Sequence, residues 1–138
     1  MDVDIRKLVP QRPPMLLTGR LEQAADDRAE TSWTVGGDCY LLDGAGRLAE
    51  TGLLEHMAQA ASALAGWRAR LAGAAEAPLG FIGEVKKFRC RRLPSVGEEL
   101  RTKVILRAEA AGVLLVEAET RADGAWVADA QLKVAIRP

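Results

Sequence analysis

Residues 48–71 form one long apolar segment, and its periodicity restricts the fold more than any other feature of the sequence. Apolar side chains recur along it at intervals of three and four, the period of an α-helix. These residues are Leu53, Met57, Ala60, Leu64, Trp67 and Leu71. The opposite side of the segment is mostly alanine, so a helix here is apolar around most of its circumference. We therefore predict that a sheet wraps around this helix, which ends near Gly73.

The segments on both sides of the helix are typical of strands joined by tight turns. After a short helical turn at residues 5–9, the predicted strands are residues 15–23, 29–35, 79–91, 100–110, 113–121 and 126–136. Asp123-Gly124 is a strong hairpin signal, because both residues tolerate positive φ. Two strands, one helix and four strands is an α+β order. It predicts a single domain, residues 1–138, in which an antiparallel sheet wraps around one long central helix.

The edges of such a sheet predict an oligomer. Six strands around one helix leave unpaired strand edges, and proteins commonly cover such edges by pairing them with another chain. We therefore expect a dimer, because two-fold pairing is the commonest closed assembly.

Charge and composition disfavour several classes of function. Lysine and arginine number 19 and aspartate and glutamate also number 19, so no net charge attracts nucleic acid or an anionic membrane. No stretch approaches the roughly 20 apolar residues of a membrane span, and we expect no signal peptide. Cys39 and Cys90 lie far apart, without the spacing of a metal site. We expect free, buried thiols, no bound metal and a cytoplasmic location.

Three stretches resemble one family in the same order along most of the chain. They are LVPQRPPMLLTGRL (residues 8–21), GLLEHMAQAASALAG (52–66) and GFIGEVKKFRCRRLPSVGEEL (80–100). The first resembles the L-x-P-H-R-x-P opening of hotdog-fold 3-hydroxyacyl-ACP dehydratases, the second their central helix with E-x-x-A-Q-A, and the third their K-F-x-R-x-x-x-P-G segment. The nearest resemblance is to dehydratase-like proteins of aryl-polyene and related polyketide pathways. It implies a hotdog fold and an acyl-thioester ligand carried on the phosphopantetheine of ACP or CoA, with no other cofactor.

The sequence departs from this family at its catalytic histidine. The family carries that histidine in a G-H-F-P-G loop just before the helix, whereas residues 36–47 contain none. The histidine of the opening P-H-R motif is replaced by Gln11. Of the family's histidine and acid pair only Glu55 remains, so the resemblance implies the fold and the ligand class more firmly than it implies activity.

Four residues of the helix are candidates for the site. Glu55 lies about one turn inside the helix, where it is either a general acid or base or a carboxylate that complements the helix dipole. Gln59, one turn further along, would hold Glu55 or anchor a loop. Gly52 would let a thioester carbonyl approach the backbone. His56 is rotated about 100° from Glu55, which favours a half-buried structural histidine over a supporting site residue.

The loop before the helix and one basic run supply further candidates. Asp38, Cys39, Tyr40 and Asp43 occupy the loop of the missing histidine, as proton donors or as ordinary turn residues. The basic run consists of Lys86, Lys87, Arg89, Arg91 and Arg92. It is either a solvated strand face or a docking surface for an acidic acyl carrier protein.

These features support three hypotheses. The first is a hydro-lyase like the 3-hydroxyacyl-ACP dehydratases of fatty-acid or polyketide biosynthesis, with Glu55 as its general acid or base. The second is a non-catalytic acyl-carrier-binding subunit, either as a homodimer or as a heterodimer with another hotdog subunit that brings the histidine. The third is a hotdog acyl-thioesterase, in which the carboxylate activates water.

Overall fold

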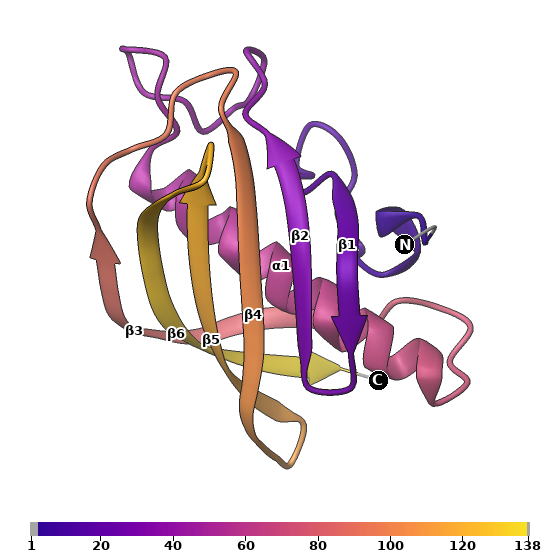
Figure 1. Cartoon of the computed structure of the whole chain (residues 1–138). Helices are drawn as coiled ribbons and strands as arrows, with labels where there is room; N and C mark the ends of the chain where they lie inside the picture. The colour runs from indigo at the N-terminus through magenta and orange to yellow at the C-terminus, as the bar shows by residue number, and fades with distance from the viewer. Residues whose placement is uncertain (1–2, 138) are drawn as a thin grey trace.

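The computed structural model describes residues 3–137 of the chain (Figure 1). Its elements, in chain order, are the 3-10 helix η1 (Ile5–Lys7), β1 (Arg20–Ala25), β2 (Arg28–Thr34), α1 (Glu50–Leu71), β3 (Leu79–Cys90), β4 (Glu99–Ala110), β5 (Val113–Ala122) and β6 (Ala125–Arg137). The predicted helix and all six predicted strands are therefore present, with shifts at their ends.

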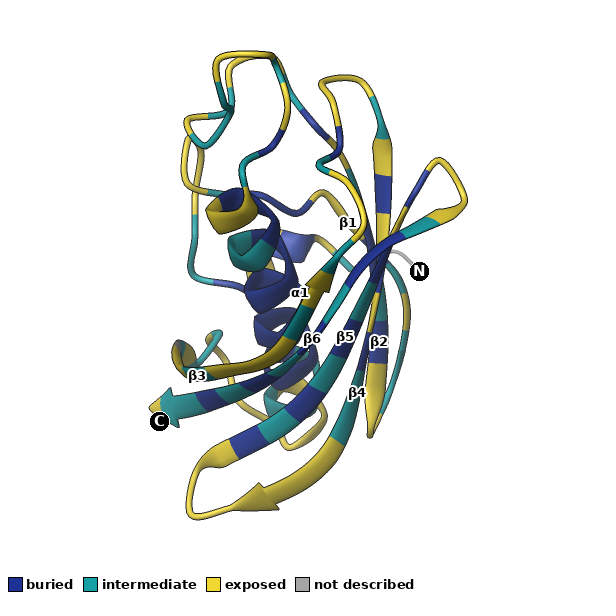
Figure 2. Ribbon diagram, turned by 90° about the vertical axis from the view of Figure 1, so that its left-hand side faces the viewer, coloured by how far each residue is buried: buried dark blue, intermediate teal, exposed yellow. Residues whose placement is uncertain are grey.

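The six strands form one antiparallel sheet in the order β1-β2-β4-β5-β6-β3. The sheet curls around helix α1, which crosses its concave side (Figures 1 and 2). Strand β3 follows the helix in sequence but pairs with β6 at one edge, while β1 forms the other edge. One long helix held by a curled antiparallel sheet is the hotdog arrangement, so the predicted fold class is confirmed.

The core fills the space between the helix and the concave face of the sheet. Every residue of α1 from His56 to Gly66 is buried. Along β5 the residues Leu114, Val116 and Ala118 are buried, and the residues between them are less so, because successive side chains of a strand point to opposite faces. The sheet therefore wraps around the apolar helix, as the sequence predicted.

The segment that precedes β1 lies along the helix rather than in the sheet. The strand predicted from residue 15 begins only at Arg20. Side chains of the helix hold the first part of this backbone: Gln59 binds Met15 and Leu17, and His56 binds Leu17. Pairing with β2 begins only at Gly19, whose amide donates to the carbonyl of Ser32. Alternation in the sequence could not reveal this, because extended backbone satisfied by side chains resembles a strand.

The turns follow the sequence closely. Asp123 and Gly124 have φ of 47° and 87°, as the hairpin prediction requires, and Ala111 and Gly112 form the corresponding turn between β4 and β5. Gly73, with φ of 93°, follows the end of the helix, as predicted. Among residues 3–137, no helix is both long and apolar enough to cross a bilayer.

Candidate active site

A cavity of about 420 Å³ lies between helix α1 and the inner face of edge strand β3. Ile82 of β3 pairs with Val134 of β6, whose buried side chain points toward the helix, and both residues line the cavity. The polar lining residues are Gln11, Glu55, Gln59 and Ser62. Three of these four come from one face of α1 at spacings of four and three residues. The cavity therefore places a few polar groups within an otherwise apolar wall.

Among the residues that the structure describes, Glu55 is the one with a titratable side chain that lines this cavity. It lies in the second turn of α1 and is half-buried. Its Oε1 accepts a hydrogen bond of 3.2 Å from Nε2 of Gln59. The carboxyl group is thus oriented by the helix, yet remains open to a ligand in the cavity, as a general acid or base must be.

Gln59 is fully buried and connects the helix to the N-terminal segment. Its Oε1 accepts from the amide of Leu17 at 2.6 Å, and its Nε2 donates to the carbonyl of Met15 at 2.8 Å. The same Nε2 reaches Glu55. Both roles predicted for Gln59, holding Glu55 and anchoring a loop, are therefore present in one side chain.

His56 is fully buried rather than half-buried as predicted, and it does not line the cavity. Its Nδ1 lies 2.6 Å from the carbonyl of Leu17, which requires Nδ1 to donate, and its Nε2 lies 2.7 Å from Oγ1 of Thr102. Trp33 stacks on the ring, with centroids 5.5 Å apart. Burial lowers the pKa of His56 to about 4, so the ring is neutral near pH 7. These contacts give His56 a structural role.

Gly52 does not serve the purpose predicted from the sequence. A Cβ at this position would lie 2.5 Å from Leu48 Cδ1 and 2.9 Å from Leu41 Cβ, and the residue is buried. The glycine therefore makes room for two leucines of the preceding loop. A thioester carbonyl has no open approach to the helix backbone there, so this part of the prediction is wrong.

Asp43 belongs to the turn chemistry of the loop before the helix. Its Oδ1 accepts from the backbone amides of Arg47 at 3.0 Å and Ala45 at 2.8 Å. These bonds, led by the one from Arg47, lower the pKa of the Asp43 carboxyl. A carboxylate whose charged form is stabilised by hydrogen bonds within its own loop is a poor proton donor.

Tyr40 is the loop residue with an electrostatic link to the candidate site. Its side chain is 44% exposed. Burial, followed by the negative charge of Glu55, raises the pKa of the phenol. Asp38 is exposed, and Cys39 is half-buried against the core. Cys39 is a free thiol, as expected, although it is less buried than predicted.

The basic run does not form a continuous positive surface. Lys86 pairs with Glu84 at 3.3 Å. Arg92 donates two hydrogen bonds of 2.7 Å to Glu98, and these bonds lower the pKa of Glu98 to about 2. Arg91, beyond the end of β3, is exposed. The ion pairs of Lys86 and Arg92 therefore neutralise part of the positive charge of the run.

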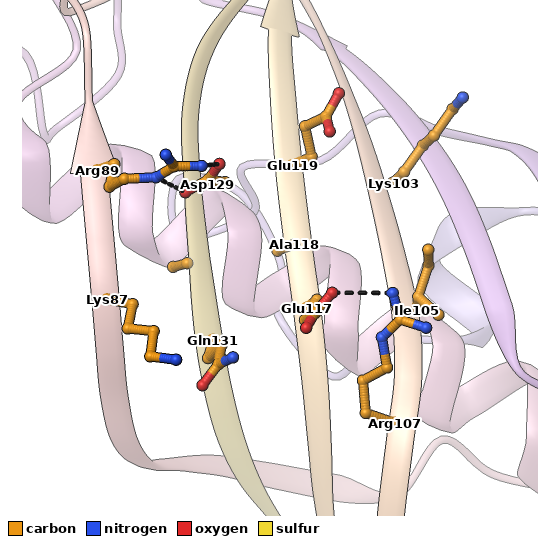
Figure 3. Close-up of a pocket in the computed structure, with 11 residues that line it drawn as sticks. Lys87, Arg89, Lys103, Ile105, Arg107, Glu117, Ala118, Glu119, Asp129 and Gln131 are labelled. Carbon is orange, nitrogen blue, oxygen red and sulfur yellow. Dashed lines mark hydrogen bonds and ion pairs between the residues drawn. The ribbon is translucent and has the colours of Figure 1, made fainter.

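Lys87 and Arg89 lie on the outer face of the sheet, away from the helix, where they line a cavity of about 380 Å³ (Figure 3). Arg89 forms an ion pair with Asp129 of β6, and Arg107 pairs with Glu117 at 2.9 Å. Four basic and three acidic side chains line this cavity, so it carries little net charge. An acidic partner gains little attraction from such a surface.

Gln11 and Ser62 line the cavity, although neither was predicted from the sequence as a site residue. Gln11 reaches the cavity because the N-terminal segment folds back along the helix. Its one sequence signal is its place in the opening motif, where the resembled family has histidine. Ser62 is recognisable only once the helix face that carries Glu55 and Gln59 is known.

A family model described as ApeP-like, ApeP dehydratase, matches residues 3–138. No curated protein matches the chain.

The structure is similar to several solved hotdog structures. A structure of the dehydratase heterocomplex ApeI:P from Xenorhabdus doucetiae matches with a TM-score of 0.92 at 21% identity, over 100% of this chain and 93% of that chain. A hypothetical thioesterase with coenzyme A from Streptococcus pneumoniae matches with a TM-score of 0.68 at 11% identity, over 86% and 84%. The PaaI protein from the phenylacetic acid degradation operon of E. coli matches with a TM-score of 0.65 at 14% identity, over 83% and 80%. At these identities the similarity shows the fold.

Proposed function

This chain belongs to the ApeP-like dehydratase family, and on that premise we propose that it removes water from a 3-hydroxyacyl thioester, with Glu55 transferring the proton. The observation that carries the proposal is the position of Glu55, the one titratable side chain that lines the cavity beside β3 within residues 3–137. The pathway proposed is aryl-polyene or related polyketide biosynthesis.

The reaction requires a base and an acid. The base takes the proton from C2, the C2–H electron pair forms the C2–C3 double bond, and the C3–O bond breaks as the hydroxyl receives a proton and leaves as water. Glu55 supplies one such group, and no other described residue that lines the cavity has an acidic or basic side chain. A second titratable group is therefore expected from outside the cavity walls.

A partner subunit is the source that we favour for that second group. His56 is enclosed and neutral, and it is the sole histidine of the chain. The similar structure from Xenorhabdus doucetiae is a heterocomplex. We propose that this chain pairs with a second hotdog subunit, whose side chains complete the cavity at the open edge of β3. Tyr40, which is exposed and within the electrostatic influence of Glu55, is the alternative within the chain.

The proposed substrate is carried on the phosphopantetheine of ACP or CoA in the cytoplasm. The basic run supports docking of an acidic carrier protein only weakly, because Lys86, Arg89 and Arg92 are paired with acids of this chain. Lys87 and Arg91 are the two members of the run for which residues 3–137 show no ion pair.

Glu55→Gln tests the proposal. The substitution keeps the shape of the side chain but removes its titratable proton, so turnover of a 3-hydroxyacyl-ACP should fall roughly 10²–10⁴-fold. The chain is assayed alone and with a second hotdog subunit, following both the 2-enoyl product and free acid.

Glu50→Gln is the matched control, since Glu50 is an exposed carboxylate in the first turn of the same helix and does not line the cavity. It should leave turnover unchanged, and neither variant should shift the melting temperature by more than a few degrees. Full activity in Glu55→Gln would contradict the catalytic role. Release of free acid instead of a 2-enoyl product would favour the thioesterase hypothesis.

A further inference from the structure

We infer that Gln11 accepts a hydrogen bond from the 3-hydroxyl group of the substrate and thereby orients the leaving group in the cavity that it shares with Glu55. This inference rests on the proposed function for its substrate class. It adds a substrate-positioning residue from a segment outside the helix.

The starting observation is a buried acceptor without a partner. Oε1 of Gln11 is buried and makes no hydrogen bond with any residue that the structure describes. An amide carbonyl removed from water without a new hydrogen bond loses the full free energy of its hydration. Gln11 lines the cavity, so a donor placed in the cavity would satisfy it.

The backbone around Gln11 is held rigidly. Nη1 of Arg12 donates to the carbonyls of Val9 and Gln11 at 2.9 and 2.8 Å, and Nη2 donates to the carbonyl of Arg6 at 2.9 Å. Pro10 precedes Gln11 and has a restricted φ. The backbone that carries the acceptor is therefore held in place before a ligand arrives, which lowers the entropic cost of orienting a reacting group.

The same segment is fastened to the helix on both sides of Gln11. A Cβ at Gly66 would lie 2.1 Å from the carbonyl oxygen of Leu8, so the backbone touches the helix there. Further along, Gln59 binds Met15 and Leu17. Gln11 lies between these two attachments and thus faces the stretch of helix between Gly66 and Gln59.

A hydroxyl group fits this acceptor better than the thioester does. A thioester carbonyl offers no hydrogen to Oε1, whereas a hydroxyl offers one hydrogen and two lone pairs. With its hydrogen directed to Gln11, the hydroxyl presents its lone pairs to the acid that protonates it. Glutamine does not titrate, so Gln11 orients the leaving group and transfers no proton.

The test measures binding of two amide-linked pantetheine analogues, whose C2 protons are too weakly acidic for elimination. One carries a 3-hydroxyacyl chain and the other the saturated chain of equal length. We expect Gln11→Leu in the full-length chain to weaken binding of the 3-hydroxyacyl analogue roughly five- to tenfold, the effect of one neutral hydrogen bond. Binding of the saturated analogue should be unchanged or tighter.

Two further variants complete the design. Gln11→Glu keeps an acceptor and should restore the preference for the 3-hydroxyacyl analogue. Gln131→Leu removes the same amide from the outer face of β6 and should change neither affinity.

Each remaining outcome overturns the inference. Equal losses for both analogues would assign the contact to the pantetheine arm, and no loss for either would leave Gln11 without a ligand role. Both of these outcomes leave the proposed function intact. If the wild-type chain binds neither analogue, the proposed function fails together with the inference.

Discussion

Three polar residues of one helical stretch have three different environments. Glu55 is half-buried at a cavity, His56 is enclosed by Trp33, Leu17 and Thr102, and Gln59 is buried with each amide atom bonded. A rotation of about 100° per residue separates Glu55 from His56 but returns Gln59 to the face of Glu55. Residues adjacent in sequence thus differ in accessibility by their angle around the helix.

The buried ring of His56 predicts that acid destabilises the fold in a defined pH range. Its pKa is about 4 in the folded protein against about 6.5 when unfolded, so between these values the unfolded chain binds more protons. Stability should therefore fall as the pH drops from about 6.5 to 4, by about 3 kcal/mol from this group. Denaturant unfolding at a series of pH values measures this change.

His56→Gln is the control for this range. It removes the titration, so its stability should be lower at neutral pH but much flatter between pH 6.5 and 4. Glu98, whose pKa is lowered to about 2 by Arg92, loses its contribution only below about pH 4.5 and does not interfere in the upper range. An unchanged slope in His56→Gln would show that another group causes the pH dependence.

At the scale of elements, the N-terminal segment and helix α1 act as one unit. The segment packs its backbone on Gly66 at one end and is held by Gln59 and His56 at the other. This attachment brings Gln11 into the cavity, although the segment belongs to neither the helix nor the sheet. The geometry of the candidate site thus depends on Gly66, which does not itself line the cavity.

Gly66→Ala should disturb this attachment. Alanine gains roughly 1 kcal/mol of helix propensity, but overpacking costs roughly 1–3 kcal/mol or more. The colliding atoms belong to the backbone of Leu8, which cannot rotate away as a side chain can. We therefore expect a net loss in the free energy of unfolding, together with weaker ligand binding at Gln11.

Gly44→Ala is a matched control, because nothing lies within 4 Å of the Cβ that it would add. Chemical denaturation should place it within about 0.5 kcal/mol of the wild type. A Gly66→Ala variant that is more stable than the wild type would contradict the close approach of Leu8.

At the scale of the whole molecule, the open edge at β3 lies next to the candidate site. Its inner side presents Ile82 and Val85, which are 40% and 36% exposed although they face the same way as the core residues Val134 and Leu132. Figure 2 shows this edge beside the helix, with exposed residues along β3. A subunit that paired with this edge would cover these side chains and border the cavity.

Val85→Lys tests assembly through this edge. A charged side chain on the inner side of an edge strand opposes pairing, so light scattering across a dilution series should show a lower dimer fraction than in the wild type. Val113→Lys, at a similarly exposed valine that begins β5, is the control and should leave association unchanged. A wild-type chain that stays monomeric at micromolar concentration, alone and with a second hotdog subunit, would contradict the predicted dimer.

Local patterns in the sequence were enough to predict several parts of this protein. The period of residues 48–71 predicted the enclosed helix, alternation and Asp-Gly or Ala-Gly turns predicted five of the six strands closely, and three motifs in order predicted the family, which the match over residues 3–138 confirms. Such patterns can be read from a sequence because the spacing of buried residues and the φ preferences of turn residues involve only near neighbours in the chain.

Contacts between groups that are distant in the sequence became known from the three-dimensional structure. The capture of Met15 and Leu17 by Gln59, the enclosure of His56 and the position of Gln11 in the cavity each join segments about 40 residues apart or more. The leucines that fill the space at Gly52 likewise depend on the path of the loop before the helix. These contacts arise from packing between segments, and packing of that kind leaves no periodic signal in any one stretch of sequence.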